Sequence, residues 1–366
     1  MITIVSIINA LESFAPPAYQ ESYDNSGLII GDASQTCTGI LCSLDATEEV
    51  ILEAKAKGCN LVVAHHPIVF GGLKKITGKN YVERTVITAI KNDIAIYAIH
   101  TNADNIISGV NDVIANKLGL IDKKILVPKK NLLAKLITFI PTSHFAQVRK
   151  ALFDAGAGNI GNYHEASFSN EGIGTYTANE KANPFLGEIG KNHEEIERRI
   201  EVIFPIHTQR HVIKALKEAH PYEEVAYDII PLANENDEVG SGLIGSLPNP
   251  ITETALLEKT KQVFGLKVIK HTPLLGKPVS KVALCGGSGS FLTKDAIAAG
   301  ADFYITADVK YHEFFDAENR IVIADIGHWE SEQFTVDLLF DILHLKFPTF
   351  AVLKSEVNTN SVRYFL

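Results

Sequence analysis

Short apolar runs alternate with longer amphipathic stretches in the first third of the chain. Residues 40–67, ILCSLDATEEVILEAKAKGCNLVVAHHP, predict a strand, a helix and a second strand, with Thr47 as the helix N-cap and Lys57-Gly58 at the helix end. A helix predicted over 81–91 leads into a further strand, DIAIYAIHTNAD. Such alternation favours βαβ units around a parallel or mixed sheet.

The C-terminal part of the chain repeats this scheme in the segments KVALCGGSGS, ADFYITADV and RIVIADIGHWESE. The two ends can be aligned, with residues 58–64 (GCNLVVA) over residues 300–306 (GADFYIT), which places His66 over Asp308. Chance is a reasonable alternative for such short apolar matches. A second match between the two halves makes chance a weaker explanation.

That second match is a histidine followed four residues later by a carboxylate. His100 and Asp104 follow one predicted strand, and His328 and Glu332 follow the equivalent strand of the other half. We therefore predict a pseudo-duplicated α/β domain whose strand ends converge on one site.

A different unit separates the two halves and has its own internal repeat. ITFIPTSHFAQVRKAL, from residue 137, matches EVIFPIHTQRHVIKAL, from residue 201, and each copy predicts a strand, a turn and an amphipathic helix. Two such copies suggest a ferredoxin-like α+β sandwich. We predict that this sandwich occupies 127–232, inserted into a discontinuous α/β domain of residues 1–126 and 233–366.

Composition narrows the class of protein. The 366 residues can form two or three compact units, and 46% hydrophobic with 21% charged residues is typical of a globular protein. A net charge of −9 disfavours extended binding to nucleic acid or to an anionic membrane. No apolar run approaches the ~20 residues that span a bilayer. Residues 1–14 lack a basic start and predict an amphipathic helix, not a signal peptide.

The cysteines show no metal-binding spacing. Cys37, Cys42, Cys59 and Cys285 form no CxxC pair, and three of them lie in or beside apolar segments. We expect reduced packing residues in a cytoplasmic protein.

Polar side chains that can bind metal ions gather at the predicted strand ends. They are His65, His66, His100, Asp104, Asp308, His312, His328, Glu330 and Glu332. Open α/β sheets bind ligands beyond the carboxyl ends of their strands. A mixed set of imidazoles and carboxylates suits zinc, manganese or ferrous iron, and its lack of thiolates excludes a structural cysteine-type zinc site. Because the set exceeds the needs of one ion, we expect two metal ions sharing a carboxylate.

Each of these residues also has a simpler interpretation. Single histidines are commonly caps or hydrogen-bonded polar residues, and we interpret His144, His207 and His211 in this way. His65 and His66 alone could merely end a buried strand. GHWESE could simply begin a helix, because acidic residues interact favourably with a helix N-terminus. The metal interpretation depends on the conjunction across the two halves.

The motifs AHHP, HTNADN, GHWESEQ, YDNSGLIIGD and GGSGS together resemble the GTP cyclohydrolase 1 type 2 homolog family, the Nif-three-like dinuclear-metal hexameric proteins. The resemblance covers essentially the whole chain, since long members carry an insert resembling PII or CutA domains. It implies a homohexamer with two divalent ions per subunit. The implied metal ligands are His65, His66, Asp104, His328 and Glu332, with Asp104 and Glu332 as bridging groups.

Two functions fit these features. The first is a metal-dependent hydrolase of a small anionic substrate, a nucleotide or phosphoester, with His100 as proton shuttle or as a partner that fixes Asp104. The second is non-enzymatic metal storage, metal transfer or regulatory scaffolding, with the insert supporting an oligomer. The GGSGS stretch at residue 286 lacks GK[ST], so we expect a tight turn near the site instead of a phosphate-binding loop.

Overall fold

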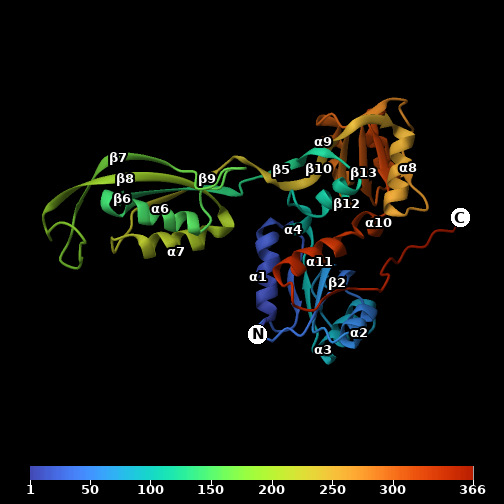
Figure 1. Cartoon of the computed structure of the whole chain (residues 1–366), viewed down its shortest axis with the longest axis horizontal. Helices are drawn as coiled ribbons and strands as arrows, with labels where there is room; N and C mark the ends of the chain where they lie inside the picture. The colour runs from blue at the N-terminus through green and yellow to red at the C-terminus, as the bar shows by residue number, and fades with distance from the viewer. Residues whose placement is uncertain (366) are drawn as a thin grey trace. The chain divides into compact units, whose positions relative to one another are not determined.

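The computed structural model describes residues 1–365 and divides into two compact units. Unit 1 combines Met1–Val127 with the residues from Glu238 onward, and unit 2 is Pro128–Asp237. The insertion predicted at 127–232 thus starts one residue later, at 128, and ends five residues later, at 237. Figure 1 colours the whole chain by residue number.

Unit 1 is a mixed α/β structure with two sheets. Before the insertion its elements are α1 (Ile4–Phe14), η1 (Pro17–Tyr19), β1 (Gly27–Ile30), β2 (Ile40–Asp45), α2 (Glu48–Ala56), β3 (Leu61–His66), α3 (Tyr81–Lys91), β4 (Ala95–Ala98), α4 (Thr101–Asp104), α5 (Val110–Lys117) and β5 (Ile121–Lys130). After it come β10 (Glu235–Thr252), α8 (Glu253–Phe264), β11 (Lys270–His271), β12 (Pro278–Ser288), η4 (Ser290–Leu292), α9 (Thr293–Ala298), β13 (Phe303–Ala307), η5 (Tyr311–Ala317), β14 (Val322–Asp325), α10 (His328–Glu332), α11 (Thr335–Lys346) and β15 (Val352–Lys354).

Several predicted elements of unit 1 are confirmed by their local chemistry. α1 lies within the predicted first helix, and α3 has the predicted bounds. Thr47 caps α2, because its hydroxyl accepts a hydrogen bond from the Val50 amide at 3.3 Å. Gly58 and Gly300, which were aligned by sequence, both have φ of 73° after their helices. Glycine adopts this left-handed conformation without the penalty of a Cβ atom.

Each of the two sheets of unit 1 has three parallel strands at its centre, and the two sets follow the same order. In the first sheet the order is β1-β4-β3-β2-β15, with β2, β3 and β4 parallel and β1 antiparallel to β4. In the second sheet the order is β11-β14-β13-β12-β10-β5, with β12, β13 and β14 parallel and β11 antiparallel to β14. The matching order explains why His66, at the end of β3, and Asp308, just after β13, aligned in the sequence.

The helices at the end of each half cross over to the other half. α5, from the first half, packs on β12, whereas α11, from the second half, packs on β2 and β3. In Figure 1, α11 (red) lies beside β2 (blue). Each half therefore completes the other, which explains why they form one compact unit and not two domains.

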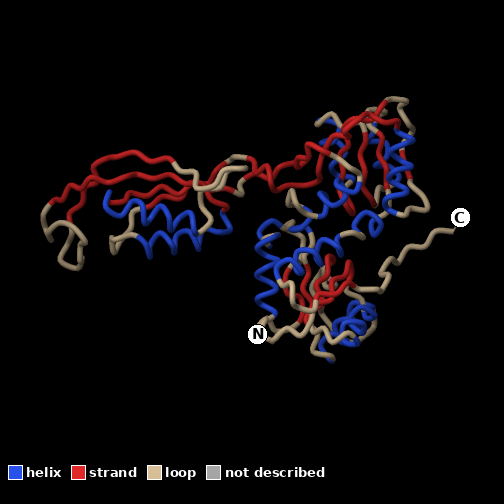
Figure 2. Tube along the Cα trace, in the orientation of Figure 1, coloured by secondary structure: helices blue, strands red, loops and turns tan. Residues whose placement is uncertain are grey.

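Unit 2 is a four-stranded antiparallel sheet with two helices on one face (Figure 2). Its elements are β6 (Leu133–Pro141), η2 (Thr142–His144), α6 (Phe145–Asp154), β7 (Phe168–Thr177), β8 (Asn192–Pro205), η3 (Ile206–Thr208), α7 (Gln209–Ala219) and β9 (Tyr227–Leu232). The strand order is β7-β8-β6-β9, with all pairs antiparallel. Both copies of the sequence repeat fold alike, since Pro141 and Pro205 each end a strand before a 3₁₀ turn and a helix.

Two expectations from composition can be compared with the described residues. Within residues 1–365, no helix has the length and apolar character needed to cross a membrane. All four cysteines are free, and Cys37, Cys42 and Cys59 are buried as expected of packing residues.

Candidate metal centre

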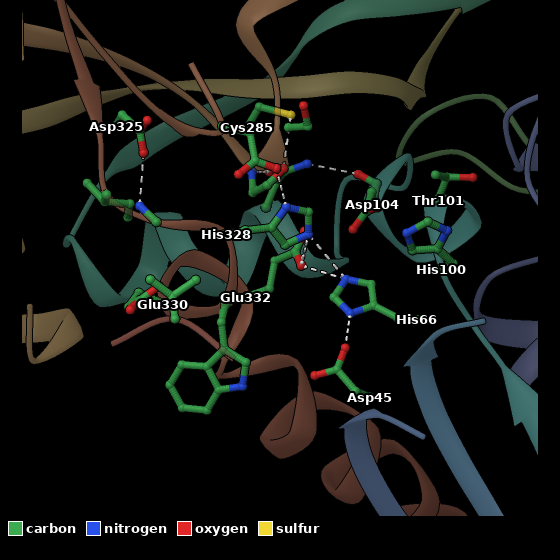
Figure 3. Close-up of a pocket in the computed structure, with 18 of the residues that line it drawn as sticks. Asp45, His66, His100, Thr101, Asp104, Cys285, Asp325, His328, Glu330 and Glu332 are labelled. Atoms are coloured by element: carbon green, nitrogen blue, oxygen red, sulfur yellow. Dashed lines mark hydrogen bonds and ion pairs between the residues drawn. The ribbon is translucent and has the colours of Figure 1, made fainter. Parts of the chain in front are cut away.

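The strand ends of unit 1 bring the predicted ligands together, and Figure 3 shows four of them, His66, Asp104, His328 and Glu332. His65 and His66 are the last residues of β3, and Asp104 is the last residue of α4, directly after β4. His328 and Glu332 begin and end α10, directly after β14. The two carboxyl edges thus supply one site from both halves of unit 1, as predicted for convergent strand ends.

The candidate ligand atoms form three overlapping groups, in each of which all atoms lie within 4.8 Å of one another. The groups are His65–His66–His100, His66–His328–Glu332 and His65–Asp104–Glu332. Glu332 belongs to both groups that contain a carboxylate, whereas Asp104 belongs to one.

His65 and Asp104 present two buried atoms that lack partners. The carbonyl of Ile99 can only accept, so His65 donates through Nδ1–H at 2.8 Å and leaves a lone pair on Nε2. That Nε2 lies 3.6 Å from Oδ1 of Asp104, and neither atom has a hydrogen bond within the described chain. Burial lowers the pKa of His65 to about 3, which keeps the imidazole neutral. Two facing buried acceptors are the arrangement that a cation between them would satisfy.

His66, His328 and Glu332 form a second, tighter cluster. Oε2 of Glu332 lies 3.0 Å from Nε2 of His66 and 3.2 Å from Nε2 of His328, and the two Nε2 atoms are 3.3 Å apart. The other oxygen, Oε1, faces Nε2 of His65 at 3.9 Å. The two oxygens of Glu332 thus face different ligand groups, so this carboxylate could contribute to both.

Hydrogen bonds within this cluster shift the pKa values of its members. Burial opposes the charge of His66, but hydrogen bonds to Asp45 and Glu332 raise its pKa to about 10. Burial likewise opposes the charge of His328, but Asp308 and Glu332 raise its pKa to about 11. Burial also disfavours charge on Glu332, yet hydrogen bonds from the two histidines hold its pKa well below the usual value.

Asp104 behaves in the opposite way to Glu332. Burial, followed by the negative charge of Glu332, raises the pKa of Asp104 well above the usual value. Without a metal ion, the raised pKa values of His66 and His328 favour protonated rings, whereas burial opposes the charge of Asp104.

Nδ1 of each candidate histidine hydrogen-bonds to a carboxylate or a carbonyl oxygen. Asp45 accepts from Nδ1 of His66 at 2.7 Å, and Asp308 accepts from Nδ1 of His328 at 2.6 Å. Asp24 accepts from Nδ1 of His100 at 2.7 Å. Such partners fix the tautomer and direct Nε2 toward a metal.

Sequence reasoning missed Asp45 and Asp24 as orienting residues. Asp45 ends β2, next to β3, so the strand-end rule that selected His66 could also have selected it. Asp24 lies in an irregular segment and carries no such signal. Nδ1 of His100 hydrogen-bonds to Asp24.

Not every candidate joins the centre. His312 lies exposed in η5 against Tyr311 and Phe315. Glu330 faces away from the ligand groups and accepts a hydrogen bond from Asn360 at 2.9 Å. His144, His207 and His211 lie in unit 2 and in none of the ligand groups.

The GGSGS stretch is the end of β12 beside the centre, and not the tight turn that the sequence predicted, because Gly286–Ser288 continue the strand with an irregular register to β13. Gly287 has φ of 59°, and a Cβ atom there would lie 2.3 Å from Oε1 of Glu332. The Gly287 amide donates a hydrogen bond to the Ser331 hydroxyl at 2.9 Å. A side chain at Gly287 would displace the shared carboxylate, so this glycine makes room for Glu332.

Known proteins match this fold and chain length closely. The model of the family described as Duf34/NIF3 (NGG1p interacting factor 3) matches residues 2–361. The chain belongs to this family. It is 40% identical over 328 residues to the GTP cyclohydrolase 1 type 2 homolog of Bacillus subtilis, covering 88% of this chain and 87% of that protein. The homolog of Halalkalibacterium halodurans is 39% identical over 325 residues, with the same coverage.

Two solved structures are similar to this chain over its whole length. A Bacillus cereus protein related to NIF3 is 38% identical and superimposes with a TM-score of 0.88, covering 100% of this chain and 99% of that one. Staphylococcus aureus protein SA1388 is 26% identical with a TM-score of 0.78 and the same coverage. The resemblance expected from the sequence motifs is confirmed.

Metal uptake by this Duf34/NIF3 centre is expected to release protons. His66 and His328 are protonated near neutral pH without metal, and imidazole binds metal only when it is neutral. Uptake at about pH 7.5 should release about two protons per chain from these rings, and affinity should rise with pH up to about 11. Calorimetric titration in two buffers of different ionisation enthalpy measures this release. Heats independent of the buffer would contradict it.

The same pKa values give the metal-free fold its own pH dependence. The pKa values of His66 and His328 are both raised above the usual value. The charged rings therefore stabilise the fold fully below pH 6.5, and this contribution is lost as the pH rises through about 10 and 11.

Proposed function

We propose that this chain is a metal-dependent hydrolase that binds two divalent ions, zinc, iron or manganese, and acts on a small anionic substrate such as a nucleotide or phosphoester. The observation that carries the proposal is the pair of ligand groups joined by Glu332. Nitrogen and carboxylate ligands without thiolates suit these ions. We assign His65, His66, Asp104, His328 and Glu332 as ligands.

Room for a substrate lies beside the proposed ligands. A cavity of about 750 Å³ in unit 1 is lined by His66, Asp104, His328 and Glu332, and by His100. When bound, the ions would supply Lewis acidity that activates water and stabilises negative charge on a phosphoryl group. His100, held by Asp24, is placed in our proposal as the residue that moves a proton.

The negative charge of the cavity wall should make the binding of an anionic substrate depend on bound metal. Lys270 is the only lysine or arginine among the described lining residues, and it pairs with Asp325 at 2.5 Å. The wall also includes several carboxylates, among them Glu21 and Glu330. A phosphoester should therefore bind only to the metal-loaded protein. The same acidic wall favours the second candidate function, metal storage or transfer, in which the cation itself is the cargo.

One experiment separates the two functions. The protein is loaded with zinc, manganese or ferrous iron and assayed against a panel of nucleotides and phosphoesters, with chelated protein as control. Turnover that chelation abolishes and one ion restores supports the hydrolase. Stoichiometric metal without turnover over the panel favours storage or transfer, and absence of bound metal contradicts both.

Replacing His100 tests its role directly. His100→Ala should keep both ions and lower turnover about 100-fold, the lower end of what general acid–base catalysis contributes. Metal stoichiometry by elemental analysis and kcat on the best substrate provide the two readings. Because His100 also groups with His65 and His66, loss of one ion would instead make it a ligand.

We further propose that unit 2 is a ferredoxin-like insert of the PII/CutA kind and that the chain assembles as a homohexamer. The β-α-β-β-α-β order and the strand order of unit 2 support the first statement. The family resemblance supports the second.

A further inference from the structure

The C-terminal segment from Ser355 to Tyr364 runs from the first half of unit 1 to the second. It leaves β15, and the Ser355 amide donates to the carbonyl of Cys42 in β2 at 2.8 Å. Farther along, Nδ2 of Asn360 donates to Oε1 of Glu330 in α10 at 2.9 Å. The segment also contributes residues to the wall of the cavity beside the proposed metal ligands.

Thr359 occupies the middle of this path and contacts both halves. Its hydroxyl donates to Oδ2 of Asp45 at 2.5 Å and accepts from Nε1–H of Trp329 at 3.2 Å. The other oxygen of Asp45, Oδ1, accepts from Nδ1 of His66 at 2.7 Å. Trp329 is the residue after His328 in α10. One hydroxyl thus lies between the carboxylate that orients His66 and the helix that carries His328.

The orientation of Asp45 depends on this contact. A carboxylate at the end of a strand can rotate about its side-chain bonds, and one hydrogen bond to His66 does not define its plane. The second hydrogen bond, on the opposite oxygen, fixes that plane and with it the ring of His66. Removal of a partner of this kind typically lowers metal affinity about 10- to 100-fold.

We infer that Thr359 is a positioning residue of the metal centre, which sets the direction of Nε2 of His66 through Asp45 and joins it to α10 through Trp329. The inference rests on the proposed function, because it assigns a role toward the proposed ions. It makes the C-terminal segment part of the site, although the segment provides no metal ligand.

The test compares Thr359→Val, Thr359→Ser and the parent chain by titration with Co²⁺, whose visible absorption reports coordination. Thr359→Val should weaken one of the two binding steps about 10-fold and change the absorption band, and Thr359→Ser should restore both. Thr38→Val is a matched control at the opposite end of β2, where the hydroxyl donates to the Gly58 carbonyl. It should bind like the parent.

A double mutant separates positioning from general destabilisation. If Thr359 acts through Asp45, adding Thr359→Val to Asp45→Asn should weaken binding by much less than it does in the parent. Equal losses in both backgrounds would overturn the inference. Trp329 is the only tryptophan, so its emission in the metal-free protein gives a second reading that should differ between the parent and Thr359→Val.

The outcomes distinguish this inference from the proposed function. A parent chain that binds no Co²⁺ contradicts the proposed function itself. A parent that binds two ions, with Thr359→Val identical to it in affinity and spectrum, overturns only the role of Thr359. Failure of Thr359→Ser to restore binding would likewise overturn it, because the hydroxyl would then not be responsible.

Discussion

Glu332→Gln is expected to abolish tight binding of both metal ions, whereas Asp104→Asn should retain one. The two oxygens of Glu332 face different ligand groups, so one substitution removes a charge from both. A unit charge pair at 4 Å is worth about 4 kcal/mol at an effective dielectric near 20, which corresponds to about 1000-fold in affinity. Elemental analysis and calorimetric titration measure the result.

Glu330→Gln is the matched control for this prediction. Glu330 lies on the same helix, two residues away, but belongs to none of the ligand groups of the described chain. It should bind two ions like the parent. If Glu332→Gln retained one tight ion while Asp104→Asn lost both, Asp104 and not Glu332 would be the principal bridge.

Removal of unit 2 is expected to leave a folded unit 1 that still binds metal. β5 and β10, which lead into and out of the insertion, are neighbours in the six-stranded sheet. Joining Val127 to Glu238 by a short glycine linker should therefore close a small gap. The Ile107 amide, which donates to the Glu238 carbonyl at 2.9 Å, helps to hold the new junction.

The deletion is tested by measuring its metal stoichiometry, its secondary structure by circular dichroism and its mass in solution. We expect parent-like metal content and secondary structure of an α/β domain, with a smaller assembly if unit 2 contributes to the proposed hexamer. Insoluble or metal-free protein would mean that unit 2 belongs to the folding core or to an obligate interface. A deletion within the loop of residues 178–191 provides a control that keeps the sheet of unit 2 intact.

Local sequence was sufficient for several of the elements and for the candidate ligands that the structure groups together. The run LVVAHHP predicts a buried strand that ends in two imidazoles, because β-branched residues favour strands and polar residues mark the edge of a sheet. The spacing of His328 and Glu332 places both on one side of a helical turn, since residues four apart are neighbours there. Their repetition in both halves predicted convergence, and the structure brings these residues into overlapping groups whose atoms could hold a metal ion.

The sequence by itself also determined the family and the repeated strand–turn–helix units of the insertion, because these depend on contiguous motifs. Only the tertiary structure distinguished the surroundings of the two candidate carboxylates. Asp104 and Glu332 look equivalent by spacing, but Glu332 belongs to both ligand groups that contain a carboxylate, whereas Asp104 belongs to one. Thr359 reaches Asp45 across 314 residues of sequence. Contacts at such separation arise from packing between the two halves, and no local pattern of polar and apolar positions encodes them.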